Sequence, residues 1–461
     1  TDENDIAYHL EKAWYLANHG RKGPVWLDIP LDVQGAPVDE SKLRHFDLAN
    51  EMVEPEVPMI SAETAKHILD KIRSAKAPLI FAGSGVRLSN SGELLLKLVE
   101  KLRIPVAVAW NSGDLIAYDN PYYAGSPSRE GTRGSAFIVQ NCDLLIVLGS
   151  RMNIRTITYN KHDFGKHAYK IMVDIDAEEL KKPSFVPDMS VQGDVRQLLE
   201  LLLAEPYTAE ALHEPWVKWC RMMVEKYPAC LPEYHQDARL NPYVFVDEMF
   251  SQMNERDVLT LGNGSACVMT FQGAKIKQGQ RMFTNSGCAA MGYGMPAAIG
   301  AAVARAADER VICIDGDGSL MMNLQELETI AFNHLNVKLF ILNNDGYHSI
   351  RQTQRNLFNG RLVGLDRTSG VGFPDFGKLA DAFGFAYFEV SQEKDLADTI
   401  ERSLDAIGPV MCNVIVDPDQ NFVPKLSSKV LPDGRIISPS MDDMFPFLPR
   451  EEYESNRYSG D

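Results

Sequence analysis

Short apolar runs alternate with helical repeats along most of this chain, and the clearest example lies between residues 311 and 354. An apolar run at 311–314 ends at a polar, glycine-rich turn at 315–319, a helical repeat follows, and a second apolar run at 337–342 ends at two asparagines. This order predicts a strand, a helix and a strand, which together form one βαβ unit. Both polar ends should then lie at the carboxyl edge of one sheet, where open α/β sheets bind their ligands.

The region 61–204 repeats this alternation and predicts another parallel, Rossmann-like sheet. We expect strands at 78–82, 106–109, 144–148 and 170–175, and helices at 62–74 and 91–102. The first of these strands ends at Gly83-Ser84-Gly85. This turn is a weak nucleotide-binding signal because the third glycine of the dinucleotide fingerprint is absent, so a purely structural turn is an equal alternative.

The two ends and the connecting segments complete the expected layout. Residues 1–38 pattern as a helix at 5–19 and a strand at 24–30, which is too little for a core, so we interpret them as the remnant of a larger domain. The expected divisions are a linker at 39–60, a central domain at 61–204, a helix-bearing connector at 205–240, a last domain at 241–418 and a C-terminal tail at 419–461. The predicted fold class is α/β, with two Rossmann-like or flavodoxin-like parallel-sheet domains and the remnant of a third.

Composition narrows the functional class. The 461 residues carry a net charge of −17, which argues against nucleic-acid and anionic-membrane partners. A long uncharged run at 286–304 is rich in glycine and alanine and contains Pro296, so we expect no membrane-spanning helix. The seven cysteines are scattered without a C-x-x-C pair, which is typical of reduced thiols in a cytoplasmic enzyme.

The turn at 315–319 has the residues of an anion site. Gly316 and Gly318 let backbone N–H groups approach an anion at the start of a helix, and the Ser319 hydroxyl can add a donor. The structural alternative is a helix that is simply capped by an aspartate and a serine.

Asp317 and Asn344 lie 27 positions apart and offer a carboxylate and an amide oxygen. With a backbone carbonyl such as that of Gly346, they form a set of hard oxygen ligands suited to Mg²⁺ holding two phosphates. An EF-hand loop also matches several of the acidic positions, but its sixth position must be glycine and here it is Leu320. A strand rather than a helix also leads into the turn. We therefore reject the EF-hand and predict a magnesium–diphosphate site.

The motif GDGS at 316–319, followed at this distance by NN at 343–344, resembles the diphosphate and Mg²⁺ motif of thiamine-diphosphate enzymes. The surrounding chain is similar to the acetolactate synthase large-subunit family of that group. This resemblance implies thiamine diphosphate and Mg²⁺ as cofactors and a 2-keto acid, pyruvate above all, as substrate. The expected reaction is decarboxylation with carboligation to a second carbonyl compound. Simple decarboxylation to an aldehyde is one alternative, and an inactive cofactor-binding subunit or fragment that needs a partner is another.

The resemblance also assigns roles to two glycine-rich segments. The turn after the strand at 257–261 is expected to meet the diphosphate, through Asn263, Gly264 and Ser265. The run at 287–298 resembles the family's GLGTMGYGLPAA, in which the methionine wedges beneath the cofactor and the carbonyl two residues earlier accepts the cofactor's amine. Those roles fall here to the catalytic candidate Met291 and to the backbone of Ala289.

The helical segment 347–354 is expected to lie over the reacting carbon, by the same resemblance. Its first residues are candidate cofactor contacts: Tyr347, His348 and Ser349. His348 is a candidate for proton transfer, and structural hydrogen bonding is an equal alternative. Acetolactate synthases carry tryptophan and methionine where this chain has Thr353 and Ser349, so the acceptor pocket is expected to differ.

Further implications concern a second cofactor and the partners. The run GSRMNIR at 149–155 resembles the family's GARFDDR, through which Arg155 would meet a flavin diphosphate, so FAD is an open alternative. Residues 1–38 resemble the last helix and strand of the family's pyrimidine-binding domain, so most of that domain, with its activating glutamate, is expected to be missing from this sequence. Family sites lie between subunits, which predicts a homodimer or homotetramer. The tail can cover the active site in relatives and would exclude water there.

Overall fold

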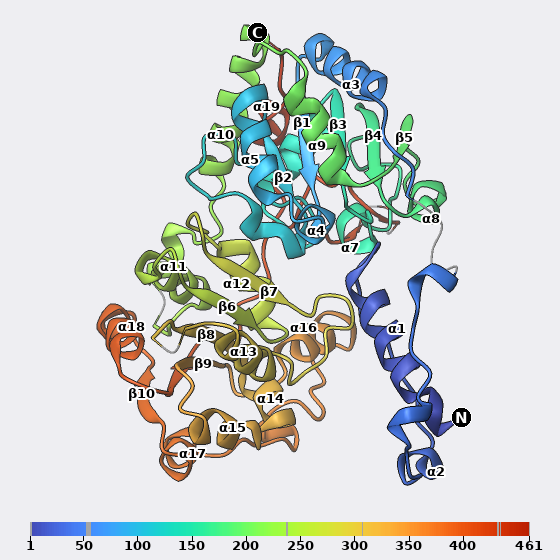
Figure 1. The fold of residues 1–461 in the computed structure, drawn as a ribbon. Coiled ribbons are helices and arrows are strands. Elements are labelled where there is room, and N and C mark those ends of the chain that lie inside the picture. The colour runs from blue at the N-terminus through green and yellow to red at the C-terminus, as the bar shows by residue number, and fades with distance from the viewer. Residues whose placement is uncertain are drawn as a thin grey trace.

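Two parallel β-sheets form the centres of two α/β units, which lie one above the other with an N-terminal arm at their side (Figure 1). The computed structural model describes residues 2–51, 57–236, 238–306, 308–430, 433 and 435–460. We call the unit around the sheet of residues 78–192 the first unit, and the unit around the sheet of residues 258–415 the second unit.

The sheet of the first unit has the strand order β2-β1-β3-β4-β5, and all of its strand pairs are parallel. Its strands are β1 (Pro78–Ala82), β2 (Val106–Val108), β3 (Leu144–Leu148), β4 (Tyr169–Asp174) and β5 (Met189–Gln192). Its main helices are α3 (Ala62–Ser74), α5 (Gly92–Leu102), α6 (Arg133–Asn141) and α9 (Val195–Ala204). Alternate residues of β3 enter opposite core clusters, and both faces of the sheet are therefore covered, as is usual for parallel sheets.

The sheet of the second unit has the strand order β10-β11-β9-β8-β6-β7 and is also fully parallel. Its strands are β6 (Val258–Leu261), β7 (Arg281–Thr284), β8 (Val311–Gly316), β9 (Val337–Asn343), β10 (Ala386–Val390) and β11 (Val410–Ile415). The covering helices are α11 (Pro242–Gln252), α12 (Ser265–Gly273), α13 (Gly294–Val303), α15 (Glu326–Phe332), α16 (His348–Leu357), α17 (Phe376–Phe383) and α18 (Leu396–Asp405). The two parallel-sheet units confirm the predicted fold class.

The expected helix after residue 319 is divided into three short pieces. These are α14 (Asp317–Leu320), the 3₁₀ turn η7 (Met321–Asn323) and α15. At the end of η7, the Asn323 side-chain amide donates to the Gly292 carbonyl at 2.7 Å. A tertiary hydrogen bond therefore accompanies the break between the pieces.

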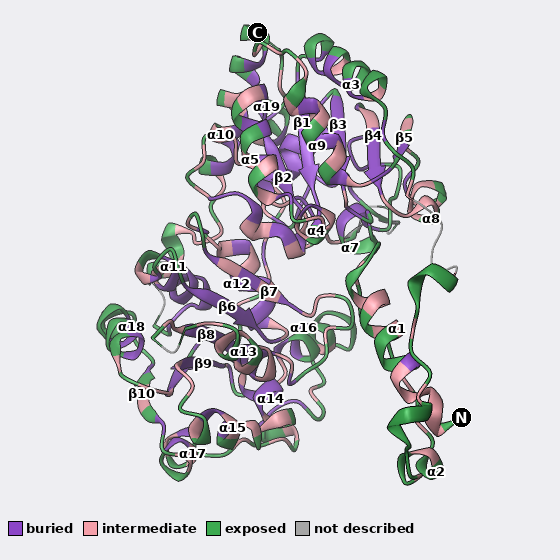
Figure 2. Ribbon diagram, viewed as in Figure 1, coloured by how far each residue is buried: buried purple, intermediate pink, exposed green. Residues whose placement is uncertain are grey.

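The N-terminal arm confirms one expected element and corrects another. The helix is present as α1 (Ile6–Asn18), but the backbone at 24–30 forms no strand. A strand needs a neighbour to share its hydrogen bonds, and here Trp26 is 90% exposed. Figure 2 shows the arm mostly exposed beside the buried sheets. A side-chain link between Arg21 and Asp176 joins the arm to the first unit.

The two units are joined at the 3₁₀ segment η4 (Trp110–Leu115), which packs on β7. The buried Asp114 carboxylate pairs with Arg87 at 2.6 Å on the first unit and with Arg281 on the second. Next to it, the Asn111 amide donates to the Ser286 hydroxyl at 2.8 Å. These contacts fix the segment that follows β7 against the first unit.

The C-terminal tail divides its contacts between the units. Phe422 meets His348 edge to face in the second unit, with ring centroids 5.1 Å apart. Met441, Met444 and, on helix α19 (Arg450–Ser455), Tyr453 join a core cluster of the first unit instead.

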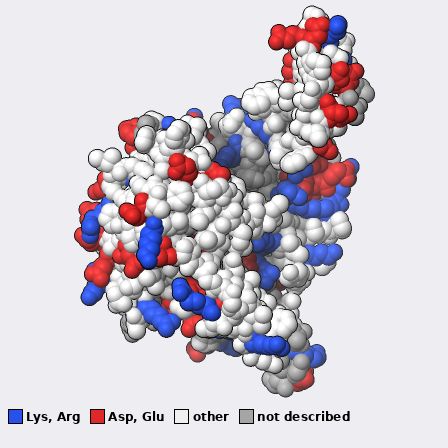
Figure 3. Space-filling view, turned by 90° about the horizontal axis from the view of Figure 1, so that it is seen from below, with Lys and Arg blue, Asp and Glu red and all other residues white. Residues whose placement is uncertain are grey.

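In the described residues no helix is long and apolar enough to cross a membrane, and all seven cysteines are free. Acidic and basic side chains are interspersed on the face seen in Figure 3.

Candidate functional site

Three neighbouring strands of the second sheet end in polar turns that touch one another. β8 lies between β6 and β9, so their carboxyl ends are adjacent. The side-chain amide of Asn344 after β9 donates to the Ser265 hydroxyl after β6 at 3.3 Å. The Gly346 N–H donates to the Asp317 carboxylate after β8 at 3.0 Å. The structure thus brings together the residues that the sequence places at one sheet edge.

The Asp317 carboxylate is at the centre of this edge and is 2% exposed. One oxygen accepts from the Gly318 N–H at 2.7 Å, and the other accepts from the Gly346 N–H. Burial raises the pKa of this carboxyl to about 6, because a charge without water or a cation is unfavourable. A bound cation would reverse that effect and favour the ionised carboxylate.

The Asn344 side chain presents an oxygen that fits a metal. Its nitrogen is used by Ser265, whereas its buried Oδ1 has no hydrogen-bond partner among the described residues. Buried polar atoms are almost always paired, so an orphaned oxygen at the same sheet edge as the Asp317 carboxylate suits an electropositive partner. The described residues contain no group of three or more His, Cys, Asp or Glu side chains that could hold a metal ion. Mg²⁺ typically takes one or two protein carboxylates and completes its shell with phosphates and water, which suits this donor set.

The glycines of the turn differ in what surrounds them. A Cβ on Gly316 would meet no described atom within 4 Å, so its backbone stays open to an anion. A Cβ on Gly318 would lie 2.3 Å from the Tyr347 ring, so this glycine makes room for that ring. Gly264 has a φ of +57° and lies close to the Ser349 hydroxyl.

Ser319 has a different contact from the one that the sequence predicts. Its hydroxyl oxygen accepts from the Gly292 N–H at 2.9 Å. The hydroxyl therefore ties the turn after β8 to the segment that carries Met291. Met291 itself is 38% exposed.

The Ala289 backbone lies beside the turn after β6. Its φ of +51° is unusual for a residue with a Cβ, and its carbonyl accepts from the Asn263 side-chain amide. A carbonyl oxygen has two lone pairs, so Ala289 can still accept from a ligand. Asn263 thus orients Ala289 here, a role that its position after a strand does not reveal.

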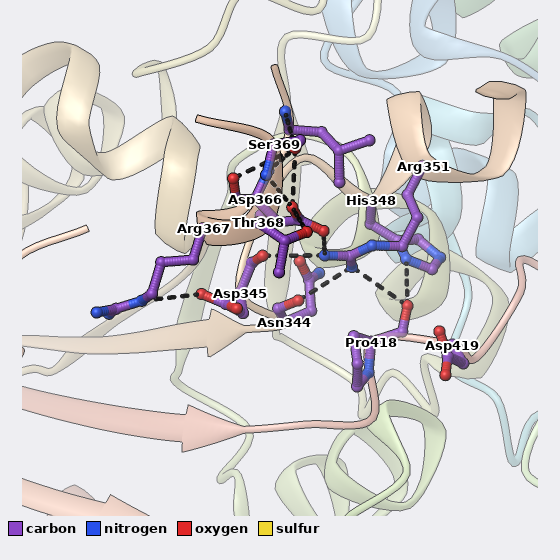
Figure 4. A network of polar contacts seen from close by, with 12 residues as sticks. Asn344, Asp345, His348, Arg351, Asp366, Arg367, Thr368, Ser369, Pro418 and Asp419 are labelled. Atoms are coloured by element: carbon purple, nitrogen blue, oxygen red, sulfur yellow. Dashed lines mark hydrogen bonds and ion pairs between the residues drawn. The ribbon is translucent and has the colours of Figure 1, made fainter. Parts of the chain in front are cut away.

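His348 lies at the start of α16 and is 5% exposed. Its Nδ1–H donates to the Pro418 carbonyl at 3.2 Å, and its Nε2 accepts from the Gln352 amide. Burial and the nearby Arg351 lower its pKa to about 4, so the ring is neutral near pH 7. Figure 4 shows the bond to Pro418. Both ring nitrogens are engaged, which favours the structural hydrogen-bonding role over proton transfer.

The sequence did not predict the burial of two residues of the site, Asp315 and Arg351. Asp315 is fully buried, its Oδ2 has no partner in the described part of the chain, and burial raises its pKa to about 7. A Cβ on Gly262 would lie 1.8 Å from its carboxylate, so a glycine on the neighbouring strand end makes room for it. Arg351 is 4% exposed and contacts the loop that follows β9. Its polar position on a helix gives no sign of burial.

The glycine turns of the first unit pack against each other. The Gly85 N–H donates to the Gly149 carbonyl at 2.9 Å, so it is already used within the protein. Arg151 pairs with Glu179 at 2.8 Å, whereas Arg155 is exposed on the short helix α7 (Ile154–Ile157). FAD binding through Arg155 therefore stays an open alternative.

Comparisons with known proteins find matches for both units of the chain. Residues 262–414 match the model of the thiamine pyrophosphate enzyme C-terminal TPP-binding domain, and residues 65–202 match that of the thiamine pyrophosphate enzyme central domain. The chain is 31% identical over 441 residues to the acetolactate synthase large subunit of Cyanidium caldarium, an alignment that covers 92% of this chain and 72% of that protein. It is 30% identical to the acetolactate synthase isozyme 1 large subunit of Escherichia coli (strain K12), with 92% and 74% covered.

Proposed function

This chain belongs to the thiamine pyrophosphate enzymes, in the group that contains the acetolactate synthase large subunits, and on that premise we propose that it decarboxylates a 2-keto acid and joins the remainder to a second carbonyl compound. The proposed cofactors are thiamine diphosphate and Mg²⁺, and the proposed donor substrate is pyruvate. The observation that carries the proposal is the unpartnered Asn344 Oδ1, which lies at the same sheet edge as the buried Asp317 carboxylate.

The residues that would hold the cofactor come from all three turns. Asp317, Asn344 and the Gly346 carbonyl would hold Mg²⁺, whose charge would offset the cost of burying Asp317. The open backbone of Gly316 and the start of α12 at Ser265 would face the diphosphate. When bound, thiamine diphosphate supplies the carbanion chemistry that allows a 2-keto acid to lose CO₂.

The other site residues would orient the cofactor. The half-exposed Met291 would support its central part, and the Ala289 carbonyl, held by Asn263, would accept its amine. His348 would hold the start of α16 against Pro418 rather than move a proton, because neither ring nitrogen is free. Ser349 and Thr353 are exposed on α16, where their small side chains leave room for an acceptor substrate.

Binding and product analysis test the proposal. Calorimetry should show thiamine diphosphate binding only when Mg²⁺ is present, and incubation with pyruvate should release CO₂ and form acetolactate. Acetaldehyde as the only product would refute carboligation and support a simple decarboxylase. Magnesium-dependent binding without CO₂ release, even in a protein that includes a whole pyrimidine-binding domain, would refute the catalytic proposal and leave a cofactor-binding subunit.

We also propose a homodimer or homotetramer with the site between subunits. Exposed apolar side chains near the site support it, since they suit a second protein surface: Met291, Met322, Ile350, Leu357 and Phe358. Sedimentation velocity should show a dimer or larger species, and a fully active monomer would contradict this part of the proposal.

A further inference from the structure

The loop that carries two of the proposed magnesium ligands has an unusual backbone. Asp345 has a φ of +51° and Gly346 a φ of +145°, in the left-handed half of conformational space. Such a conformation costs free energy and persists only when the surroundings hold it. The positions of the Asn344 side chain and the Gly346 carbonyl therefore depend on whatever holds this loop.

The Arg351 guanidinium holds the loop by its backbone (Figure 4). Nη1 donates to the Asn344 carbonyl at 3.0 Å, and Nη2 donates to the Asp345 carbonyl at 2.9 Å. A planar guanidinium with fixed donors sets the relative position of two consecutive peptides, which a flexible ammonium cannot do. The contact is buried, so water does not compete for it.

Arg351 also connects the loop to two distant segments. It pairs with the Asp366 carboxylate at 3.6 Å and donates to the Pro418 carbonyl at 3.3 Å. Next to Asp366, the Leu365 carbonyl accepts from the Tyr347 N–H at 3.0 Å. A Cβ on Gly346 would lie 2.2 Å from that same carbonyl, so the loop is enclosed on this side as well.

A second buried arginine shows what a purely structural role looks like. Arg133 is 8% exposed and donates to the Met444 and Pro446 carbonyls of the tail. Neither of those residues carries a site atom. Arg351, in contrast, holds the backbone of Asn344 and Asp345, in the loop that carries two of the proposed ligands.

We propose that Arg351 is the positioning residue of the magnesium loop, holding Asn344 and Gly346 where they can ligate the ion. This inference rests on the proposed function. Groups that orient metal ligands typically contribute about 10–100-fold to metal affinity. Arg351 does not touch the ion or the substrate, so its effect appears in how much Mg²⁺ the protein needs to bind thiamine diphosphate.

The test measures Mg²⁺-dependent thiamine diphosphate binding by calorimetry, together with the melting temperature of the metal-free protein. Arg351→Gln and Arg351→Lys should both raise the Mg²⁺ concentration required, by about 10-fold or more for glutamine. Asp366→Asn should shift the requirement in the same direction and provides the test if Arg351→Gln does not fold. The matched control is Arg367→Gln, because Arg367 reaches the exposed Asp345 side chain at 3.9 Å but not the backbone.

Arg133→Gln is the control for buried arginines in general. It should lower the melting temperature and leave the Mg²⁺ requirement unchanged. If the Arg351 variants behave like Arg133→Gln, with a lower melting temperature and an unchanged requirement, the inference is wrong. Failure of the unaltered protein to bind thiamine diphosphate with Mg²⁺ would instead overturn the proposed function, so the two failures are distinguishable.

Discussion

The first sheet carries glycine turns at 83–85 and 149–150, and the second sheet carries them at 262–265 and 315–319. In the first unit these turns satisfy each other: the Gly83 N–H donates to the Leu148 carbonyl at 2.8 Å, and the Gly85 N–H donates to Gly149. In the second unit they leave buried oxygens without partners, on Asn344 and Asp315, in the described part of the chain. Both units are built on a parallel sheet, but among the described residues it is the second unit that has unpaired buried oxygens at these strand-end turns.

This contrast separates two uses of glycine at a strand end. A Cβ on Gly83 would lie 2.4 Å from the backbone oxygen of Gly149, so this glycine permits two turns to pack together. Gly316 has open space in the corresponding place, which permits a ligand to approach. A glycine-rich turn after a strand is thus compatible with either role, and the atoms left unpaired around it decide between them.

The largest expected effect follows from removing the central carboxylate. Asp317→Asn keeps the size of the side chain but removes its charge, so Mg²⁺-dependent thiamine diphosphate binding should weaken by more than the roughly 100-fold upper range seen for groups that only orient ligands. Calorimetry measures this loss. Ser84→Ala, at the exposed turn of the first unit, is the control and should bind normally. Normal binding by Asp317→Asn would show that the second sheet edge does not hold the metal.

A pair of glycine substitutions gives the next largest effect and sharpens the comparison. Gly318→Ala places a methyl group against the Tyr347 ring, which must move away from the site, so cofactor affinity should fall by about 10-fold. Gly83→Ala places a methyl group against a backbone that cannot move as easily, so stability should fall by about 1–3 kcal/mol with no change in cofactor affinity. Calorimetry and denaturant unfolding measure the two quantities. A loss of cofactor affinity in Gly83→Ala would contradict the view that the first sheet edge is purely structural and the second binds the cofactor.

The arrangement of the site could be predicted because it follows from local patterns. Two apolar strands end at Gly316 and Asn343, and a helical segment joins them. This order alone places both strand ends at a common sheet edge. The strand expected at 24–30 is absent for the opposite reason: a strand exists only through its neighbours, and in the described part of the chain no strand pairs with these residues.

The inner contacts of the site could not be predicted, because they join segments far apart in sequence. The neutral state of His348 depends on its burial and on the nearby Arg351, and its ring donates to the Pro418 carbonyl, 70 residues away. The burial of Arg351 can be understood only from the carbonyls that accept its hydrogen bonds, and one of these, on Pro418, lies 67 positions away. Asp315 was visible as part of DGDGS, but its burial depends on the absent side chain of Gly262 on another strand.

The pH dependence of stability provides a smaller effect. Burial raises the pKa of Asp317 from 3.8 to about 6, so its contribution to stability is fully present below about pH 4 and is lost as pH rises through 6. In metal-free protein, the melting temperature of Asp317→Asn relative to the unaltered protein should therefore increase by a few degrees between pH 5 and 8, as the buried charge forms in the latter only. Scanning calorimetry at several pH values measures this difference. A difference that decreases with pH would mean that the charged carboxylate already has a stabilising partner in the metal-free protein.

The smallest expected effect lies at the first sheet edge, where Arg155 is exposed on α7. Because the neighbouring glycine N–H of Gly85 is already used within the protein, we expect added FAD to leave the melting temperature unchanged. Arg155→Gln should likewise leave Mg²⁺-dependent thiamine diphosphate binding unchanged. Thermal melting with and without FAD, in both proteins, measures this. A rise in melting temperature with FAD that is lost in Arg155→Gln would establish a ligand site at the first sheet edge. Hydrogen bonds between glycine turns would then no longer indicate a purely structural role.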